Sequence, residues 1–190
     1  MSEPIVVVSG IPRSGTSLMM QALDAGGVPS LSDGLRSADP DNPRGYYELE
    51  PVKKLATPGD HSWLEQAPGH VIKVIHSLVR YLPTEHHYKI IMLHRDLDEV
   101  LASQAAMLQR LGKTGGRLDS ERLKAIFRKQ MEETVGLIQS RPEMDLYQTD
   151  YRRVILEPQP VMGEISQFLG GLDVEAMVRA VDPSLYRQRR

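Results

Sequence analysis

The first seventeen residues constrain the fold most strongly. Four β-branched residues, at positions 5–8, stand between Pro4 and Gly10 and lead into a loop that ends in a helical segment. An apolar run this short predicts a strand that is buried on both faces, as in a parallel sheet. Gly10 and Gly15 allow backbone N–H groups to turn inward around an anion, and the helix predicted over 17–23 adds a partial positive charge. Strand, glycine loop and helix therefore indicate an α/β unit that binds phosphate.

The remainder of the chain alternates between strand-like and helix-like segments. Short apolar runs predict three further strands, over 71–75, 89–93 and 144–148. Apolar residues at helical spacing predict helices over 97–111, 120–139, 158–169 and 174–181, and a short helix over 50–56. Residues 28–47 are rich in Pro, Gly, Asp and Ser and predict an irregular surface loop. Alternation of this kind predicts a three-layer α/β sandwich with a mainly parallel central sheet.

Length and composition limit the classes of protein to consider. At 190 residues the chain suits a single domain over 1–190. The net charge of −2 gives no general attraction for nucleic acid, and the chain has no cysteine, which excludes thiolate catalysis and cysteine-bound zinc. We expect no metal site and no membrane span, because no apolar stretch approaches the ~20 residues that a span needs. We therefore expect a cytoplasmic protein.

The glycine loop differs from the loop of nucleoside triphosphatases at one position. Residues 10–17 read GIPRSGTS, and the glycine spacing matches the P-loop pattern G-x-x-x-x-G-K-[ST]. Thr16 stands where that pattern has a lysine, which offsets phosphate charge during transfer. This argues against ATP or GTP hydrolysis. The loop carries its positive charge at Arg13 instead, and the alternative is a glycine turn that binds nothing.

The loop resembles a known family. It is similar to the 5′-phosphosulfate loop of sulfotransferases that use 3′-phosphoadenosine 5′-phosphosulfate (PAPS), in the variant typical of the smaller, mostly bacterial members. The resemblance implies a P-loop sulfotransferase-like fold and a loop that binds the nucleotide. The loop residues that would do so are Pro12, Arg13, Ser14, Gly15, Thr16 and Ser17.

A second segment resembles the 3′-phosphate site of the same family. There, a strand ends in Arg and a Ser follows eight residues later on a helix; Arg95 and Ser103 occupy these positions. An Arg offers a planar fork of donors to a phosphate, and a Ser adds a hydroxyl. The alternative is a structural ion pair between Arg95 and Asp98 or Glu99.

Three candidate catalytic residues follow from the resemblance. Lys73 and His76 resemble, with one extra residue between them, the K-T-H segment that carries the family's catalytic histidine. His76 is the first candidate for the general base, since an imidazole titrates near neutral pH, and Glu48 is the second. A strand-end cap and a surface carboxylate are the alternatives. Arg13 would act as an electrostatic clamp, because its guanidinium stays protonated.

The implied reaction moves a sulfuryl group from PAPS to a hydroxyl or amine on a small-molecule or carbohydrate acceptor and yields the nucleotide PAP. Tyr46, Tyr47 and Trp63 are candidate walls of the acceptor site. The chain has no match to the Gly-rich, Lys-containing loop that covers the nucleotide in many members, and its basic end, residues 186–190, is a candidate substitute. A P-loop small-molecule kinase and a non-catalytic nucleotide-binding module are the alternative functions.

Overall fold

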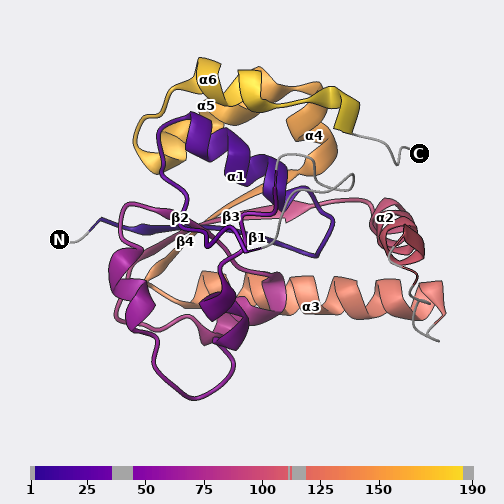
Figure 1. Ribbon diagram of the computed structural model, residues 1–190, viewed down its shortest axis with the longest axis horizontal. Coiled ribbons are helices and arrows are strands. Elements are labelled where there is room, and N and C mark those ends of the chain that lie inside the picture. The colour runs from indigo at the N-terminus through magenta and orange to yellow at the C-terminus, as the bar shows by residue number, and fades with distance from the viewer. Residues whose placement is uncertain (1–2, 36–44, 111, 113–118, 186–190) are drawn as a thin grey trace.

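The computed structural model describes residues 3–35, 45–110, 112 and 119–185, which form three layers (Figure 1). Within these residues, the central layer is a parallel sheet with the strand order β2-β1-β3-β4. The predicted α/β class and the parallel sheet are confirmed. The strands are β1 (Ile5–Gly10), β2 (Val71–Lys73), β3 (Tyr88–His94) and β4 (Met144–Asp150).

Helices cover both faces of this sheet. One face carries α1 (Thr16–Ala25), α4 (Tyr151–Leu156), α5 (Pro158–Leu169) and α6 (Val174–Ala180). The other face carries α3 (Ser120–Ser140) and short 3₁₀ segments. Figure 1 also shows that α2 (Leu97–Arg110) lies beyond the carboxyl ends of the strands, where ligands of parallel sheets bind.

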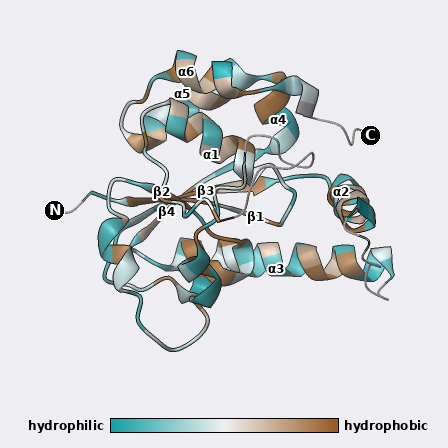
Figure 2. Ribbon diagram, in the orientation of Figure 1, coloured by the Kyte–Doolittle hydropathy of each residue, from teal (hydrophilic) through white to brown (hydrophobic). Residues whose placement is uncertain are grey.

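The strands are apolar on both sides because each side meets a core. Val6 and Val8 of β1 belong to the core cluster under α1, whereas Ile5 and Val7 belong to the cluster on the α3 side. Figure 2 shows the same pattern, with hydrophobic strands between helices whose outer surfaces are hydrophilic. A continuous β-branched run is what a strand covered on both faces requires.

Most predicted elements are present, with small differences at their ends. The segment predicted as a helix over 50–56 is a 3₁₀ segment, Glu50–Lys54, and β2 ends two residues earlier than predicted. Helix α4 was not predicted, because it begins directly after β4 without an intervening loop. The Asp150 carboxylate accepts a hydrogen bond from the Arg152 N–H (2.7 Å) and caps α4. Residues 36–44 and 186–190, which include part of the predicted surface loop and the basic end, lie outside the described residues.

Candidate functional site

The glycine loop joins β1 to α1 through a tight turn. The Ser14 N–H donates to the Ile11 carbonyl (3.0 Å), and both Arg13 (φ 80°) and Gly15 (φ 97°) have left-handed backbones. Gly15 is required by space as well, since a Cβ there would lie 2.2 Å from the Tyr151 ring. Helix α1 begins at Thr16, and the first N–H groups of a helix have no partner within it. The loop therefore offers backbone donors at the carboxyl end of β1.

The two segments predicted to bind phosphate meet in space. Arg13 Nε donates to Ser103 Oγ (3.0 Å), which links the loop to α2 across 90 residues. Arg95 Nη1 donates to the Arg13 carbonyl oxygen (2.9 Å). A third bond, from Gln104 Nε2 to the Pro12 carbonyl (3.2 Å), adds to this contact. The residues singled out on the loop, at the end of β3 and on α2 thus share one site.

Arg95 also has a structural partner. Its Nε lies 3.0 Å from Glu99 Oε2, and the two side chains are only 8% and 7% exposed. The guanidinium carbon stacks 4.5 Å from the centre of the Tyr151 ring. The alternative of an ion pair is therefore realised with Glu99, whereas Asp98 pairs with Lys124 (2.7 Å). These contacts hold the Arg95 guanidinium beside the loop.

Lys73 and His76 reach the same loop from β2 and the segment after it. Lys73 Nζ donates to Ser17 Oγ (3.2 Å) and to the carbonyl oxygen of Tyr46. His76 is 4% exposed; its Nδ1 lies 3.3 Å from the Gly10 carbonyl oxygen and its Nε2 lies 3.1 Å from Gln130 Oε1 on α3. The imidazole thus bridges the start of the loop to α3.

The remaining candidates, Glu48 and three aromatic residues, have various partners. The Glu48 carboxylate forms an ion pair with Lys53 (3.3 Å). Of the candidate acceptor walls, Tyr47 packs against the core under α1, and Trp63 packs against the core on the α3 side of the sheet. Tyr46 is buried, with Lys73 Nζ 5.9 Å from its ring centre. The role of these three residues as walls of the acceptor site stays a prediction.

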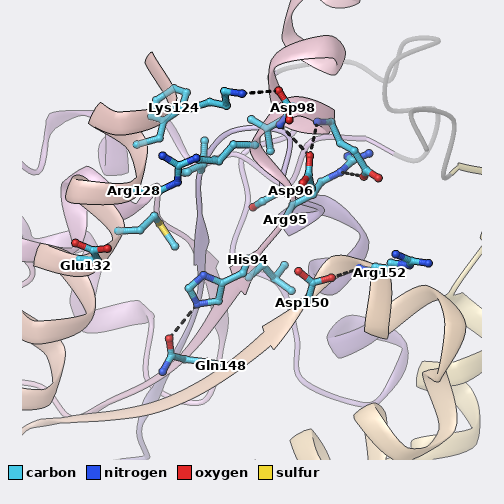
Figure 3. A pocket seen from close by; sticks show the side chains of 18 of the residues that line it. His94, Arg95, Asp96, Asp98, Lys124, Arg128, Glu132, Gln148, Asp150 and Arg152 are labelled. Atoms are coloured by element: carbon cyan, nitrogen blue, oxygen red, sulfur yellow. Dashed lines mark hydrogen bonds and ion pairs between the residues drawn. The ribbon is translucent and has the colours of Figure 1, made fainter. Parts of the chain in front are cut away.

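A cavity of about 780 Å³ opens beneath the first turn of α2. In Figure 3, side chains of α3 lie on one side of it, and side chains from the ends of β3 and β4 lie on the other. Ile11 and Ser14 of the glycine loop, together with Arg95, also line it. Sequence reasoning did not find this cavity. Its wall on α3 combines Phe127 and Met131, which lie on the apolar stripe of the helix, with the charged residues Lys124, Arg128 and Glu132.

The described residues contain no cluster of metal ligands and no helix suited to span a membrane. Within residues 3–35, 45–110, 112 and 119–185, no three His, Asp or Glu side chains gather as metal ligands would. Over the same residues, none of the helices combines the length and the apolar character needed to cross a bilayer.

Comparisons with known proteins identify the fold. No family model matches the chain, and no curated protein matches it in sequence. Sulfotransferase STF1 from Mycobacterium tuberculosis H37Rv has a similar structure, with a TM-score of 0.64 and 15% identity over 95% of this chain and 71% of that one. The sulfotransferase domain of the Synechococcus PCC 7002 olefin synthase has a TM-score of 0.59 and 16% identity, over 100% and 90% of the two chains.

Mouse sulfotransferase SULT7A1, whose structure was determined with PAP, is also similar, with a TM-score of 0.51 and 16% identity over 99% of this chain and 66% of that one. Identities this low show the fold alone. The chain therefore has a sulfotransferase-type fold, as the resemblance of its two phosphate segments implied.

Proposed function

We propose that this chain transfers a sulfuryl group from PAPS to a hydroxyl or amine acceptor and releases PAP. The observation that carries the proposal is the hydrogen bond between Arg13 Nε and Ser103 Oγ (3.0 Å). It unites a segment that resembles a 5′-phosphosulfate loop with one that resembles a 3′-phosphate site. The sulfotransferase-type fold supports the same function.

The two phosphate groups of the nucleotide would occupy neighbouring subsites. The N–H groups at the start of α1 and the Arg13 guanidinium would hold the 5′-phosphosulfate, with the Thr16 and Ser17 hydroxyls as further donors. Arg95 and Ser103 would hold the 3′-phosphate. Because Arg13 and Ser103 already contact each other, one bound ligand would accept hydrogen bonds from both segments.

In the proposed reaction, the acceptor atom attacks sulfur and forms a new bond to it. The bond from sulfur to the bridging oxygen of PAPS breaks, and negative charge develops on that oxygen. Arg13 and Lys73, whose Nζ lies 3.2 Å from Ser17 Oγ, would stabilise this charge. The reaction needs no divalent metal, which distinguishes it from ATP-dependent phosphoryl transfer.

The acceptor proton would pass to a general base, and His76 is our first choice. In the tautomer whose Nδ1–H donates to the Gly10 carbonyl, Nε2 is unprotonated and would accept the proton once the acceptor displaces Gln130. Glu48 is the second choice. A His76→Gln variant that loses kcat at saturating PAPS while it still binds PAP, beside a Glu48→Gln variant that keeps kcat, would assign the base to His76.

One contact favours a second candidate function, a small-molecule kinase. Lys73 brings an ammonium group from β2 to the end of the loop, where a P-loop lysine would act in an ATP-dependent enzyme. Thr16 replaces that lysine in sequence, but Lys73 restores the charge in space. A kinase would require ATP and magnesium, so the nucleotide that stabilises the protein separates the two functions.

A thermal-shift experiment with PAP, and with ATP in the presence and absence of magnesium, tests the proposal. At 100 times its Kd a ligand stabilises the folded state by ~2.7 kcal/mol, which is readily measured. We expect PAP to stabilise the protein without metal. Arg95→Ala should remove this effect, and the control Arg179→Ala, at an exposed site on α6, should retain it.

Each result decides between the functions. Stabilisation by ATP only with magnesium would replace the proposal with the kinase. Stabilisation by neither nucleotide would contradict both enzymes. Tight binding of PAP without turnover of any acceptor would instead indicate a non-catalytic nucleotide-binding module.

A further inference from the structure

The cavity beneath α2 has the size and the lining of a small-molecule site. Its volume of about 780 Å³ falls within the range of about 300–1,000 Å³ that is usual for ligand pockets. Such pockets combine an apolar lining with a few polar groups that fix orientation. The cavity shares Ser14 and Arg95 with the nucleotide subsites proposed above, whereas Arg13 and Ser103 lie outside its lining, so most of the lining would stay open to a second ligand.

Part of the cavity lining is apolar. Phe127 and Met131 of α3, Leu97 and Val100 of α2 and Ile11 of the loop all line the cavity and belong to, or pack against, one core cluster. A ring-shaped or similarly bulky apolar body would bury this surface. At roughly 25 cal/mol for each Å² of apolar area removed from water, such contact is the main source of affinity available here.

The charges around the cavity are nearly balanced. Four cationic side chains and five carboxylates line it. Two of the cations are already paired, Arg95 with Glu99 (3.0 Å) and Lys124 with Asp98 (2.7 Å). A lining of this kind has no net positive charge to attract an anionic ligand, and desolvating an ion without a partner is costly. An uncharged ligand fits better.

Polar groups at the strand ends would orient such a ligand. His94 Nε2 lies 2.9 Å from Gln148 Oε1, and Figure 3 shows this pair at the cavity, across from Arg128 and Glu132 of α3. Imidazole, amide and guanidinium groups all form hydrogen bonds with hydroxyl groups. The cavity therefore suits a molecule with an apolar body and uncharged polar substituents.

The cavity also adjoins the proposed reaction centre at two points. Ile11 and Ser14 belong to the glycine loop, where the sulfuryl group would lie. Phe127 contacts the edge of the His76 imidazole, with ring centres 6.5 Å apart and planes at 87°. A ligand in the cavity would thus lie next to both the donor loop and the first-choice base.

We infer that this cavity is the acceptor site and that the acceptor is an uncharged molecule with an apolar, ring-sized body and a hydroxyl or amine group. This inference rests on the proposed sulfuryl transfer. It moves the acceptor from the predicted wall of Tyr46, Tyr47 and Trp63 to the surface between α2, α3 and the ends of β3 and β4.

A matched pair of probes tests the inference. 4-Phenylphenol is an uncharged aromatic alcohol, and 4-phenylbenzoate has a similar shape with a negative charge. Calorimetric titration of the PAP-saturated protein should show 4-phenylphenol binding at least about tenfold more tightly than 4-phenylbenzoate. Equal or tighter binding of the carboxylate would overturn the assigned class of acceptor.

Variants of α3 locate the binding site. Val135→Trp and Glu132→Trp place a large ring in the cavity from two positions, one half-buried and one exposed. Each should weaken 4-phenylphenol binding at least about tenfold. Gln139→Trp, at an exposed position of α3 outside the cavity, is the control and should bind as the unaltered protein does. The rate of sulfate-ester formation from PAPS should likewise fall in Val135→Trp and Glu132→Trp and stay unchanged in Gln139→Trp.

The thermal shift with PAP separates failure of the inference from failure of the function. If PAP stabilises all four proteins and 4-phenylphenol binds equally to each, the cavity is not the acceptor site, although the proposed function stands. If PAP stabilises none of them, the proposed function fails and the inference falls with it. Glu132→Trp keeps the test decisive if Val135→Trp does not fold.

Discussion

Two helices supply the candidate site, and the protein holds them in different ways. Helix α1 follows the glycine loop and buries a continuous run of residues, 18–23, in the core. Helix α2 is longer, yet its buried residues are Glu99, Val100 and Ser103, two of which are polar. Both helices begin near the carboxyl end of a strand. One is anchored by the core and the other by hydrogen bonds to the loop.

This difference has an energetic consequence. A fully buried aliphatic side chain contributes roughly 1.5–3 kcal/mol, whereas a single hydrogen bond contributes about 0.5–1.5 kcal/mol net. The contacts from α2 to the loop, such as Ser103 to Arg13 and Gln104 to Pro12, are of the second kind. Local opening is therefore cheaper for α2 than for α1, and a bound anion would affect α2 more.

The largest expected effect is on the free energy of unfolding, when one leucine in each helix is replaced by alanine. Leu23→Ala in α1 removes a fully buried side chain and should destabilise the protein by about 2–5 kcal/mol. Leu101→Ala in α2 removes a half-exposed one and should cost less than about 1 kcal/mol. Urea denaturation of both variants measures the difference. Similar losses of unfolding free energy in the two variants would contradict the claim that the core anchors α1 more strongly than α2.

A smaller effect is expected where α2 meets the loop. Ser103→Ala removes the acceptor for Arg13 Nε, so amide hydrogens of α2 should exchange about threefold to tenfold faster, while those of α1 are unchanged. Hydrogen-exchange mass spectrometry resolves the two helices. Addition of PAP should slow exchange in α2 of the unaltered protein, and an equal change in α1 would show that the helices respond as one body.

The smallest expected effect is on the melting temperature, and it comes from a polar cluster on the α1 face of the sheet. Hydrogen bonds from Arg153 and Tyr147 lower the pKa of Glu164 to about 2. Because the folded pKa lies below the ordinary value of 4.5, this stabilisation is present above pH 4.5 and is lost as the pH falls toward 2. Glu164→Gln should lower the melting temperature slightly near neutral pH, and the difference should shrink with acidification. A constant difference across this range would show that the carboxylate charge is not involved.

Sequence reasoning succeeded where a feature depends on neighbours in the chain. The loop, the strand ends and the eight-residue spacing from Arg95 to Ser103 are local, and they predicted groups that the structure brings together. It failed where tertiary packing decides. The contact of His76 with Gln130 spans 54 residues, and the Tyr151 ring reaches Gly15 and Arg95 from another part of the chain.

The surroundings of the candidate acceptor walls also depend on tertiary packing. Tyr47 and Trp63 pack against cores on opposite faces of the sheet. The cavity beneath α2 depends on side chains of α3 meeting those at the ends of β3 and β4, which no local pattern specifies.

The measurement that tests the shared nucleotide site most directly is a calorimetric cycle with two ligands and two proteins. PAP carries a 3′-phosphate that AMP lacks, and Arg95→Ala removes the guanidinium proposed to bind it. If one ligand spans the loop and α2, the substitution should weaken PAP binding at least about tenfold, because a charge-assisted contact is lost, and AMP binding less than about twofold. Equal losses for PAP and AMP would show that Arg95 only supports the fold of the loop, and would contradict the proposed 3′-phosphate site.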